Sequence, residues 1–166
     1  RGLSLLNDEI SKKIRVIIVG ELKKDSYCKN IIKLRNNLKL SSNVDFLGEK
    51  YGTELWKIYN SLDIYIQPSL DEAGASITIM EAMFFNLPIV ATHECKMNDI
   101  KDKSFVKLIG SKPRDIAKGL TECIKYLEEF KKEGTEAHKY IKENRSWEIM
   151  ANKMIIKYKS IKKDSD

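Results

Sequence analysis

The sequence contains few residues that cross-link, kink or divide a domain. Three of its 166 residues are cysteine, three are proline, and no segment is rich in glycine, proline or serine. The cysteines are odd in number, widely spaced and without a C-x-x-C pair, which argues against a disulfide framework, a redox motif or a cysteine metal site. They are Cys28, Cys95 and Cys123. Without an internal repeat or a linker, residues 1–166 are predicted to form a single domain.

Long apolar runs are also absent. No run approaches the ~20 residues that span a bilayer, and the first residues show neither the apolar region nor the cleavage site of a signal peptide. We therefore expect a cytoplasmic protein. The C-terminal segment is amphipathic and rich in lysine, so it is either a solvated helix or a peripheral contact with the inner face of a membrane. Its lysines are Lys153, Lys157, Lys159, Lys162 and Lys163.

Concentrated charge of one sign is lacking as well. The chain carries 30 Lys plus Arg against 24 Asp plus Glu, a net charge of +6, with the basic residues scattered among acidic ones. Proteins that bind a phosphate backbone usually concentrate basic residues on one face. We therefore predict no nucleic-acid partner. The apolar fraction of 42% suits a globular core, since a chain of this size buries about 70% of its unfolded surface.

The sequence does contain short β-branched runs that alternate with amphipathic stretches. This pattern predicts parallel strands joined by right-handed crossover helices, which is an α/β fold with a doubly wound, Rossmann-like sheet. The predicted strands are 14–19, 43–47, 64–67, 87–92 and 105–109.

Apolar spacing predicts the helices. Residues 76–85 favour a helix that begins at Ser76, a good N-cap, and the chain is helical from Pro113 onward. Two apolar stripes are predicted to face the core. One consists of Ile116, Leu120, Cys123, Leu127 and Phe130, and the other of Trp147, Met150, Met154, Tyr158 and Ile161. A short helix over 53–62 is predicted to carry Leu55, Trp56, Tyr59 and Leu62 on one face.

Ligands of a doubly wound sheet bind beyond the carboxyl ends of its strands. Three predicted loops follow directly after strands, and we expect them to meet at one rim. They are Gly20-Glu21, Gly48-Glu49 and residues 69–75. The third loop leads into a helix start, whose free N–H groups and dipole suit a phosphate. Glu81, about one and a half turns into that helix, is either a partner for ribose hydroxyls or a solvated helix residue.

Several ligand motifs are missing. Without G-x-G-x-x-G or a Walker sequence, we expect neither a nicotinamide cofactor nor ATP hydrolysis. His93 and His138 are single histidines that we expect to be non-catalytic, and we expect no metal. A glycosidase would use two facing carboxylates, and Glu72 with Glu81 would supply them, but the predicted phosphate-binding loop disfavours that interpretation.

Motifs along nearly the whole chain, in order, point to a known family. They are IYIQPSLDE at 64–72, Gly74, EAM at 81–83 and LPIVAT at 87–92, with VIIVG at 16–20, NVDFLG at 43–48 and RSW at 145–147. This order resembles the donor-binding half of the family-4 glycosyltransferases, retaining enzymes of the GT-B fold. There a strand ends in Pro-Ser, a Glu-Gly-Phe-Gly loop follows, and a helix carries Glu-Ala-Met before Gly-x-Pro-Val-Val-Ala.

The resemblance implies an activity and its residues. A hexose would pass from a nucleotide diphosphate sugar to a glycan or lipid-linked acceptor with retained configuration and without a metal, as in bacterial capsule or other surface polysaccharide synthesis. Glu72 would be the catalytic residue at the donor sugar, and Glu81 would hold the ribose. Donor-binding backbone would come from Gly74, Ala75, Ser76 and Ile77 at the phosphates or sugar, from Gly48 and Glu49 at the base, and from Gly20 and Glu21 at the rim. Arg1 stands where the family has a diphosphate-binding lysine.

The sequence departs from the family pattern in two places. Counting forward from Pro68 puts Glu72 at the first glutamate position, whereas counting back from Glu81 puts Ala73 there; one inserted loop residue would leave Glu72 in the role. The family's first strand, ending in Gly-Arg, and its N-terminal acceptor domain would precede Arg1. We therefore expect the isolated chain to transfer little or no sugar. The alternative hypothesis is a noncatalytic doubly wound nucleotide-binding or interaction module.

Overall fold

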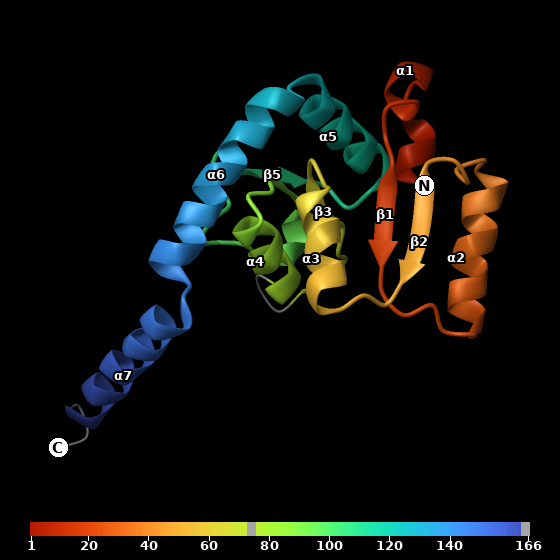
Figure 1. Cartoon of the computed structure of the whole chain (residues 1–166). Coiled ribbons are helices and arrows are strands. Elements are labelled where there is room, and N and C mark those ends of the chain that lie inside the picture. Colours follow the sequence, from red (N-terminus) through yellow and green to blue (C-terminus); the bar gives the residue numbers. More distant parts are fainter. Residues whose placement is uncertain (73–75, 164–166) are drawn as a thin grey trace.

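The computed structural model describes residues 1–72 and 76–163 (Figure 1). Within these residues five strands form, each inside or within one residue of its predicted range. They are β1 (Val16–Val19), β2 (Val44–Gly48), β3 (Tyr65–Gln67), β4 (Ile89–Thr92) and β5 (Val106–Ile109). The α-helices are α1 (Asp8–Ser11), α2 (Ser26–Asn37), α3 (Gly52–Asn60), α4 (Ile77–Phe84), α5 (Pro113–Lys125), α6 (Leu127–Asn144) and α7 (Trp147–Lys163). Two short 3-10 helices, η1 (Gly2–Leu5) and η2 (His93–Cys95), complete the order.

Local sequence signals explain where several helices begin. The side chains of Asn7, Asp25 and Ser76 each accept a hydrogen bond from a first-turn amide of α1, α2 and α4. Pro113 occupies the first turn of α5, where its missing N–H costs nothing. Asn86 takes a left-handed conformation with φ 60° just after α4, which stops the helix where the sequence predicts.

The strands pair in parallel, as predicted, but their hydrogen bonds divide them into two sheets. One contains β1 and β2, and in the other β4 lies between β3 and β5. In the doubly wound strand order 3-2-1-4-5-6, β2 and β1 take positions 3 and 2, and β3, β4 and β5 take positions 4, 5 and 6. We call the two groups the β1–β2 wing and the β3–β4–β5 wing. Position 1 lies between β1 and β3. Among the described residues no strand occupies that position (Figure 1).

The hydrophobic core surrounds β4. All four of its residues are buried. Ile89 and Ala91 belong to a cluster with residues of α4 and α6, whereas Val90 packs with Cys123 of α5. Because successive side chains of a strand point to opposite faces, helices cover β4 on both sides (Figure 1).

Close packing fixes α6 against the end of α4. A Cβ added at Gly134 would lie 1.8 Å from the carbonyl oxygen of Asn86, so only glycine fits at this crossing. His138, one turn further along α6, hydrogen-bonds through Nδ1 to the carbonyl oxygen of Phe84. The core helix α4 is therefore held at its C-terminal end by α6.

The C-terminal helix differs from its prediction. In Figure 1, α7 extends away from the rest of the domain, and Trp147 at its start is 93% exposed. Met154 and Tyr158 of the predicted stripe are exposed as well. The expected core face of α7 is wrong for the described chain, because α7 begins beyond the edge of the domain and finds no core to cover. On the apolar face predicted for 53–62, Trp56 is also exposed, while Tyr59 is buried.

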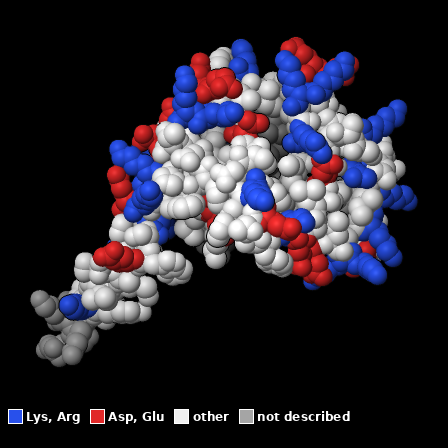
Figure 2. Space-filling model, in the orientation of Figure 1, with Lys and Arg blue, Asp and Glu red and all other residues white. Residues whose placement is uncertain are grey.

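Charged side chains are mixed over the visible surface. Figure 2 shows acidic residues among basic ones on this face, with the α2 edge mainly basic. The nucleic-acid prediction stays a prediction. Among the described residues no helix is both long enough and apolar enough to cross a membrane.

Candidate functional site

The carboxyl ends of the strands define one edge of the domain. In Figure 1 the loops that leave β1 and β2 lie along the lower edge, and α3 starts from it and returns the chain to the start of β3. The first two loops touch directly, since the amide of Gly20 donates to the carbonyl oxygen of Gly48 over 3.0 Å. Two of the three loops predicted to share a rim therefore lie together at this edge.

The β1–β2 side of the rim is open next to the backbone. Gly20 and Gly48 have φ values of +152° and +69°, and a Cβ added to either would meet nothing within 4 Å. The positive φ favours glycine, and the empty space permits close approach of a ligand. Glu21 and Glu49 beside them are exposed. A hydrogen bond with Glu49, followed by the charge of that carboxylate, raises the pKa of the nearby Tyr51.

On the β3 side, Glu72 is held by polar groups. Its Oε1 accepts hydrogen bonds from Ser69 Oγ at 2.8 Å and from Gln67 Nε2 at 3.2 Å. The buried Thr92 of β4 donates from Oγ1 to the carbonyl oxygen of Ser69 at 2.5 Å. The loop that carries Glu72 is thereby tied to the central strand of the core.

The start of α4 presents backbone donors that have no partner within the helix. Ser76 Oγ accepts from the amide of Ile79 at 3.3 Å, which satisfies one of the first-turn amides. The amides of Ile77 and Thr78 have no partner within the helix, and Ile77 is 70% exposed. An anion suits this position because the N–H groups and the helix dipole both favour negative charge. Gly74 and Ala75, predicted to share this role, and the alternative Ala73 lie outside the described residues.

Glu81 is neither free nor fully solvated. Tyr59 Oη donates to Glu81 Oε2 over 3.0 Å, from a side chain that is 6% exposed. Burial, and then the hydrogen bond with Glu81, raises the pKa of Tyr59 well above its ordinary value, so the phenol remains a donor. The half-buried Glu81 therefore has one carboxylate oxygen fixed by α3.

Lys96, which no sequence motif marks, also lies at the rim. Lys96 Nζ pairs with Asp71 Oδ1 at 3.0 Å and so links the loop after β3 to the turn after β4. Its backbone is left-handed, with φ 50° and ψ 43°, a strained conformation for a residue other than glycine. No motif signals this lysine, because both its conformation and its partner are set by tertiary structure.

Arg1 is not brought to the rim. The adjoining Gly2 packs against Ile116 and the carbonyl of Pro113 in α5. In Figure 1 the N-terminus lies beside the upper part of β2, away from the lower edge. The structure thus gathers Gly20 with Gly48, and Glu72 with the start of α4, but leaves Arg1 apart.

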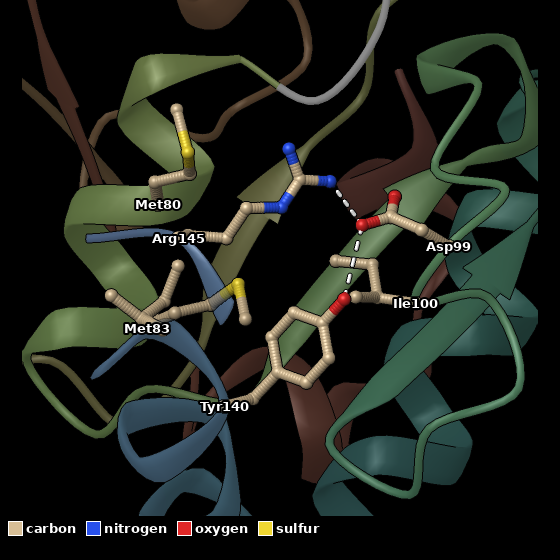
Figure 3. Close-up of a pocket in the computed structure, with 7 residues that line it drawn as sticks. Met80, Met83, Asp99, Ile100, Tyr140 and Arg145 are labelled. Atoms are coloured by element: carbon tan, nitrogen blue, oxygen red, sulfur yellow. Dashed lines mark hydrogen bonds and ion pairs between the residues drawn. The ribbon is translucent and has the colours of Figure 1, made fainter. Parts of the chain in front are cut away.

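A narrow pocket between α4 and α6 is lined by residues that hold these elements together. In Figure 3 the side chains of Arg145, Asp99 and Tyr140 converge beside Met80 and Met83. Asp99 accepts from Tyr140 Oη at 3.1 Å and forms an ion pair with Arg145. Burial raises the pKa of Asp99, but the hydrogen bond and charge of Arg145 outweigh it and lower the pKa overall. A second hollow is open to solvent and is lined by Phe105, just before β5, and by Glu143 of α6.

Some residues of this site were missed in the sequence. Gln67 was assigned only to a strand, although a polar residue at a strand end, just before Pro68, is a signal for the rim. Tyr59 was assigned to an apolar stripe, because a tyrosine in such a stripe gives no sign of a partner for its hydroxyl. Within residues 1–72 and 76–163 no three potential metal ligands meet, and the expectation of metal-independent chemistry stays a prediction.

Comparison with known proteins places this arrangement in a family. Protein CapJ from Staphylococcus aureus is 33% identical over 101 residues, which are 60% of this chain and 24% of CapJ. HepE from Anabaena, solved in complex with UDP-glucose, superposes with a TM-score of 0.74 at 18% identity, covering 96% of this chain and 43% of that one. The C-terminal domain of LpcC, a glycosyl transferase group 1 family protein from Francisella tularensis, gives a TM-score of 0.65 at 19% identity, covering 82% and 90%. The chain thus spans about a quarter of CapJ and less than half of HepE.

The family model for glycosyl transferases group 1 matches residues 3–147, most of the chain. The parallel α/β arrangement with a helical C-terminus is that of the C-terminal domain of GT-B glycosyltransferases. The chain therefore belongs to the glycosyl transferases group 1 family.

Proposed function

We propose that this chain binds the nucleotide diphosphate sugar donor of a retaining hexosyltransferase. The observation that carries the proposal is the arrangement around α4, where Glu72 precedes the open helix start and Glu81 follows it. The UDP-glucose complex of HepE, a protein of the same fold, supports a donor of this class. Glu72 contacts the sugar as the catalytic residue, and Glu81 binds the ribose.

In this proposal, catalysis is mainly electrostatic. The leaving nucleoside diphosphate gains negative charge, which the amides of Ile77 and Thr78 stabilise from fixed positions. Lys96 supplies a cation at the same rim once the diphosphate replaces Asp71 as its partner. Gly20 and Gly48 let the nucleotide approach the backbone, with Glu49 beside the base.

The acceptor and the cellular setting are further parts of the proposal. Family resemblance supports a glycan or lipid-linked acceptor in bacterial surface polysaccharide synthesis, which takes place on the cytoplasmic side of the membrane. The exposed apolar residues and lysines of α7 suit either a solvated helix or a peripheral membrane contact. Membrane contact stays a prediction.

We also propose that a further strand completes the sheet. The inner edges of β1 and β3 have no strand partner among the described residues, and the doubly wound order places a strand between them. A preceding segment that ends in Gly-Arg would supply both the strand and a diphosphate-binding arginine. An acceptor domain would precede that segment, and without it the 166-residue chain is expected to transfer little or no sugar.

Calorimetry with UDP-, ADP- and GDP-linked sugars tests donor binding by the chain. We expect one class to bind and Glu81→Ala to weaken it by about tenfold, since a hydrogen bond between a hydroxyl and a carboxylate is lost. Glu136→Ala, an exposed change on α6, is the matched control. Absence of binding by all three classes, with no effect of Glu81→Ala, would overturn the proposal in favour of a noncatalytic interaction module.

A further inference from the structure

Two tyrosines lie behind the two glutamates of the proposed donor site. Tyr59 and Tyr65 have ring centroids 6.3 Å apart, and Tyr59 stacks on Phe85 at 5.1 Å with the rings nearly parallel. The hydroxyl of Tyr59 contacts Glu81 directly, and that of Tyr65 reaches Glu72 through Gln67. The aromatic cluster thus connects to both carboxylates.

The connection to Glu72 depends on the orientation of one amide. Tyr65 Oη donates to Gln67 Oε1 at 2.6 Å, so the amide nitrogen of Gln67 faces the other way and donates to Glu72. With the amide reversed, Gln67 would place its carbonyl oxygen against the carboxylate, which has no proton to donate. The carboxylate therefore sets the orientation of the amide, and the Tyr65 hydroxyl, by donating to the amide oxygen, holds the Gln67 side chain in that orientation against Glu72.

Each carboxylate is held by one oxygen only. Ser69 and Gln67 both donate to Oε1 of Glu72, whereas Tyr59 donates to Oε2 of Glu81. Among the described residues, nothing donates to Glu72 Oε2 or to Glu81 Oε1. Each glutamate is thus oriented by the protein and keeps one oxygen for a ligand hydroxyl.

We propose that Tyr59 and Tyr65, the latter acting through Gln67, are positioning residues for separate parts of the donor. Tyr59 orients Glu81 toward the ribose, and Tyr65 orients Glu72 toward the sugar. This inference rests on the proposed function and adds the residues that fix the two carboxylates. Tyr59 is buried and Tyr65 is half-buried, and each acts through the side chain that its hydroxyl contacts.

Two isosteric variants test the division of roles. Tyr59→Phe and Tyr65→Phe each remove one hydroxyl and keep the ring, and Tyr27→Phe, on the exposed face of α2, is the matched control. Calorimetry compares UDP with UDP-glucose, and likewise ADP with ADP-glucose and GDP with GDP-mannose. UDP carries the ribose but no sugar, so the pair separates the two contacts.

We expect Tyr59→Phe to weaken UDP and UDP-glucose alike, by about five- to tenfold, because the ribose contact is common to both. Tyr65→Phe should weaken UDP-glucose by a similar factor and leave UDP unchanged. A general loss of structure would lower both affinities in both variants, and thermal melting of each variant against Tyr27→Phe measures any such loss.

The failures are distinguishable. If the unmodified chain binds one nucleotide pair and both variants bind it with unchanged affinity, the positioning roles are wrong while the proposed function stands. Equal weakening of UDP and UDP-glucose by Tyr65→Phe overturns the separate roles. Absence of binding by the unmodified chain with every pair overturns the proposed function and this inference together.

Discussion

The two wings of the domain are built to different degrees of completeness. In the β3–β4–β5 wing, Ile89 at the start of the central strand is 0% exposed, with helices on both faces and a strand on either side. In the β1–β2 wing, Ile18 is 42% exposed, and β1 has a strand partner on one edge only among the described residues. The β3–β4–β5 wing therefore contains the hydrophobic core. The β1–β2 wing leaves one edge of β1 without a strand partner among the described residues and leaves Ile18 partly exposed.

The proposed donor site is divided between the two wings. The complete wing holds the two glutamates through hydrogen bonds that lead back into the core, from Thr92 to Ser69 and from Tyr59 to Glu81. The incomplete wing offers open backbone at Gly20 and Gly48. We infer that the complete wing pre-organises sugar and ribose recognition through side chains, whereas the β1–β2 wing contributes open backbone to nucleotide binding.

The same substitution in the two wings should give the largest contrast. Ile89→Ala is expected to lower the free energy of unfolding by about 3 to 4 kcal/mol, because a fully buried side chain leaves a cavity. Ile18→Ala should cost about 1 kcal/mol, since much of that side chain is already in water. Chemical denaturation of both variants measures the difference, and equal losses would contradict the contrast between the wings.

Packing of α6 onto α4 can be tested by adding a single methyl group. Gly134→Ala is expected to destabilise the fold by about 2 kcal/mol, because its Cβ would overlap the carbonyl of Asn86. Glu136→Ala on the exposed side of the same helix is the control and should change little. A Gly134→Ala protein as stable as the control would show that the crossing is loose.

Acid should weaken the complete wing through the Arg145–Asp99 pair. The folded pKa of Asp99 lies below its ordinary 3.8. Its stabilising effect is therefore fully present above about pH 4 and is lost as the pH falls through the lower folded value. Asp99→Asn should flatten this acid dependence, with an effect of at most about 1 kcal/mol since the pair is partly exposed. Chemical denaturation at several pH values below about 4 measures this dependence, with the exposed Asp102→Asn as the control. The same pH dependence of stability in both variants would contradict the role given to the Arg145–Asp99 pair.

Hydrogen exchange gives the smallest but most local contrast. The amide of Val16 donates to the carbonyl oxygen of Asn43, the residue before β2, and that of the next residue, Ile17, points to the opposite edge of β1 because bonding alternates along a strand. Ile17 should therefore exchange faster than Val16. In β4, which pairs on both edges, Ile89 and Val90 should both exchange slowly. Equal protection of Ile17 and Val16 would mean that the inner edge of β1 is already covered.

Local signals in the sequence predicted much of the fold. The β-branched runs, the N-cap at Ser76 and the stop at Asn86 placed the strands and α4, because each depends on residues close in sequence. The exposure of Trp147 could not be predicted. An apolar stripe indicates that a helix has a face suited to burial, but it does not indicate whether another element packs against that face. The split between β1 and β3 likewise depends on which strands are available to pair.

The candidate site was predictable only in outline. Strand ends located the rim, and family resemblance selected Glu72 and Glu81. The hydrogen bonds that orient these carboxylates join residues 5 and 22 positions apart in the chain. Whether a tyrosine hydroxyl or a lysine such as Lys96 meets a carboxylate depends on tertiary packing, which leaves no periodic signal.

Backbone NMR of the chain titrated with UDP-glucose, ADP-glucose and GDP-mannose tests most directly whether the two wings form one donor site. We predict that one of these nucleotide sugars shifts the amides of Gly20 and Gly48 in the β1–β2 wing together with those of Ser76 and Ile77 at the start of α4. The shifts should follow a single saturation curve. Absence of shifts with all three sugars, or shifts confined to residues away from the rim, would contradict the account.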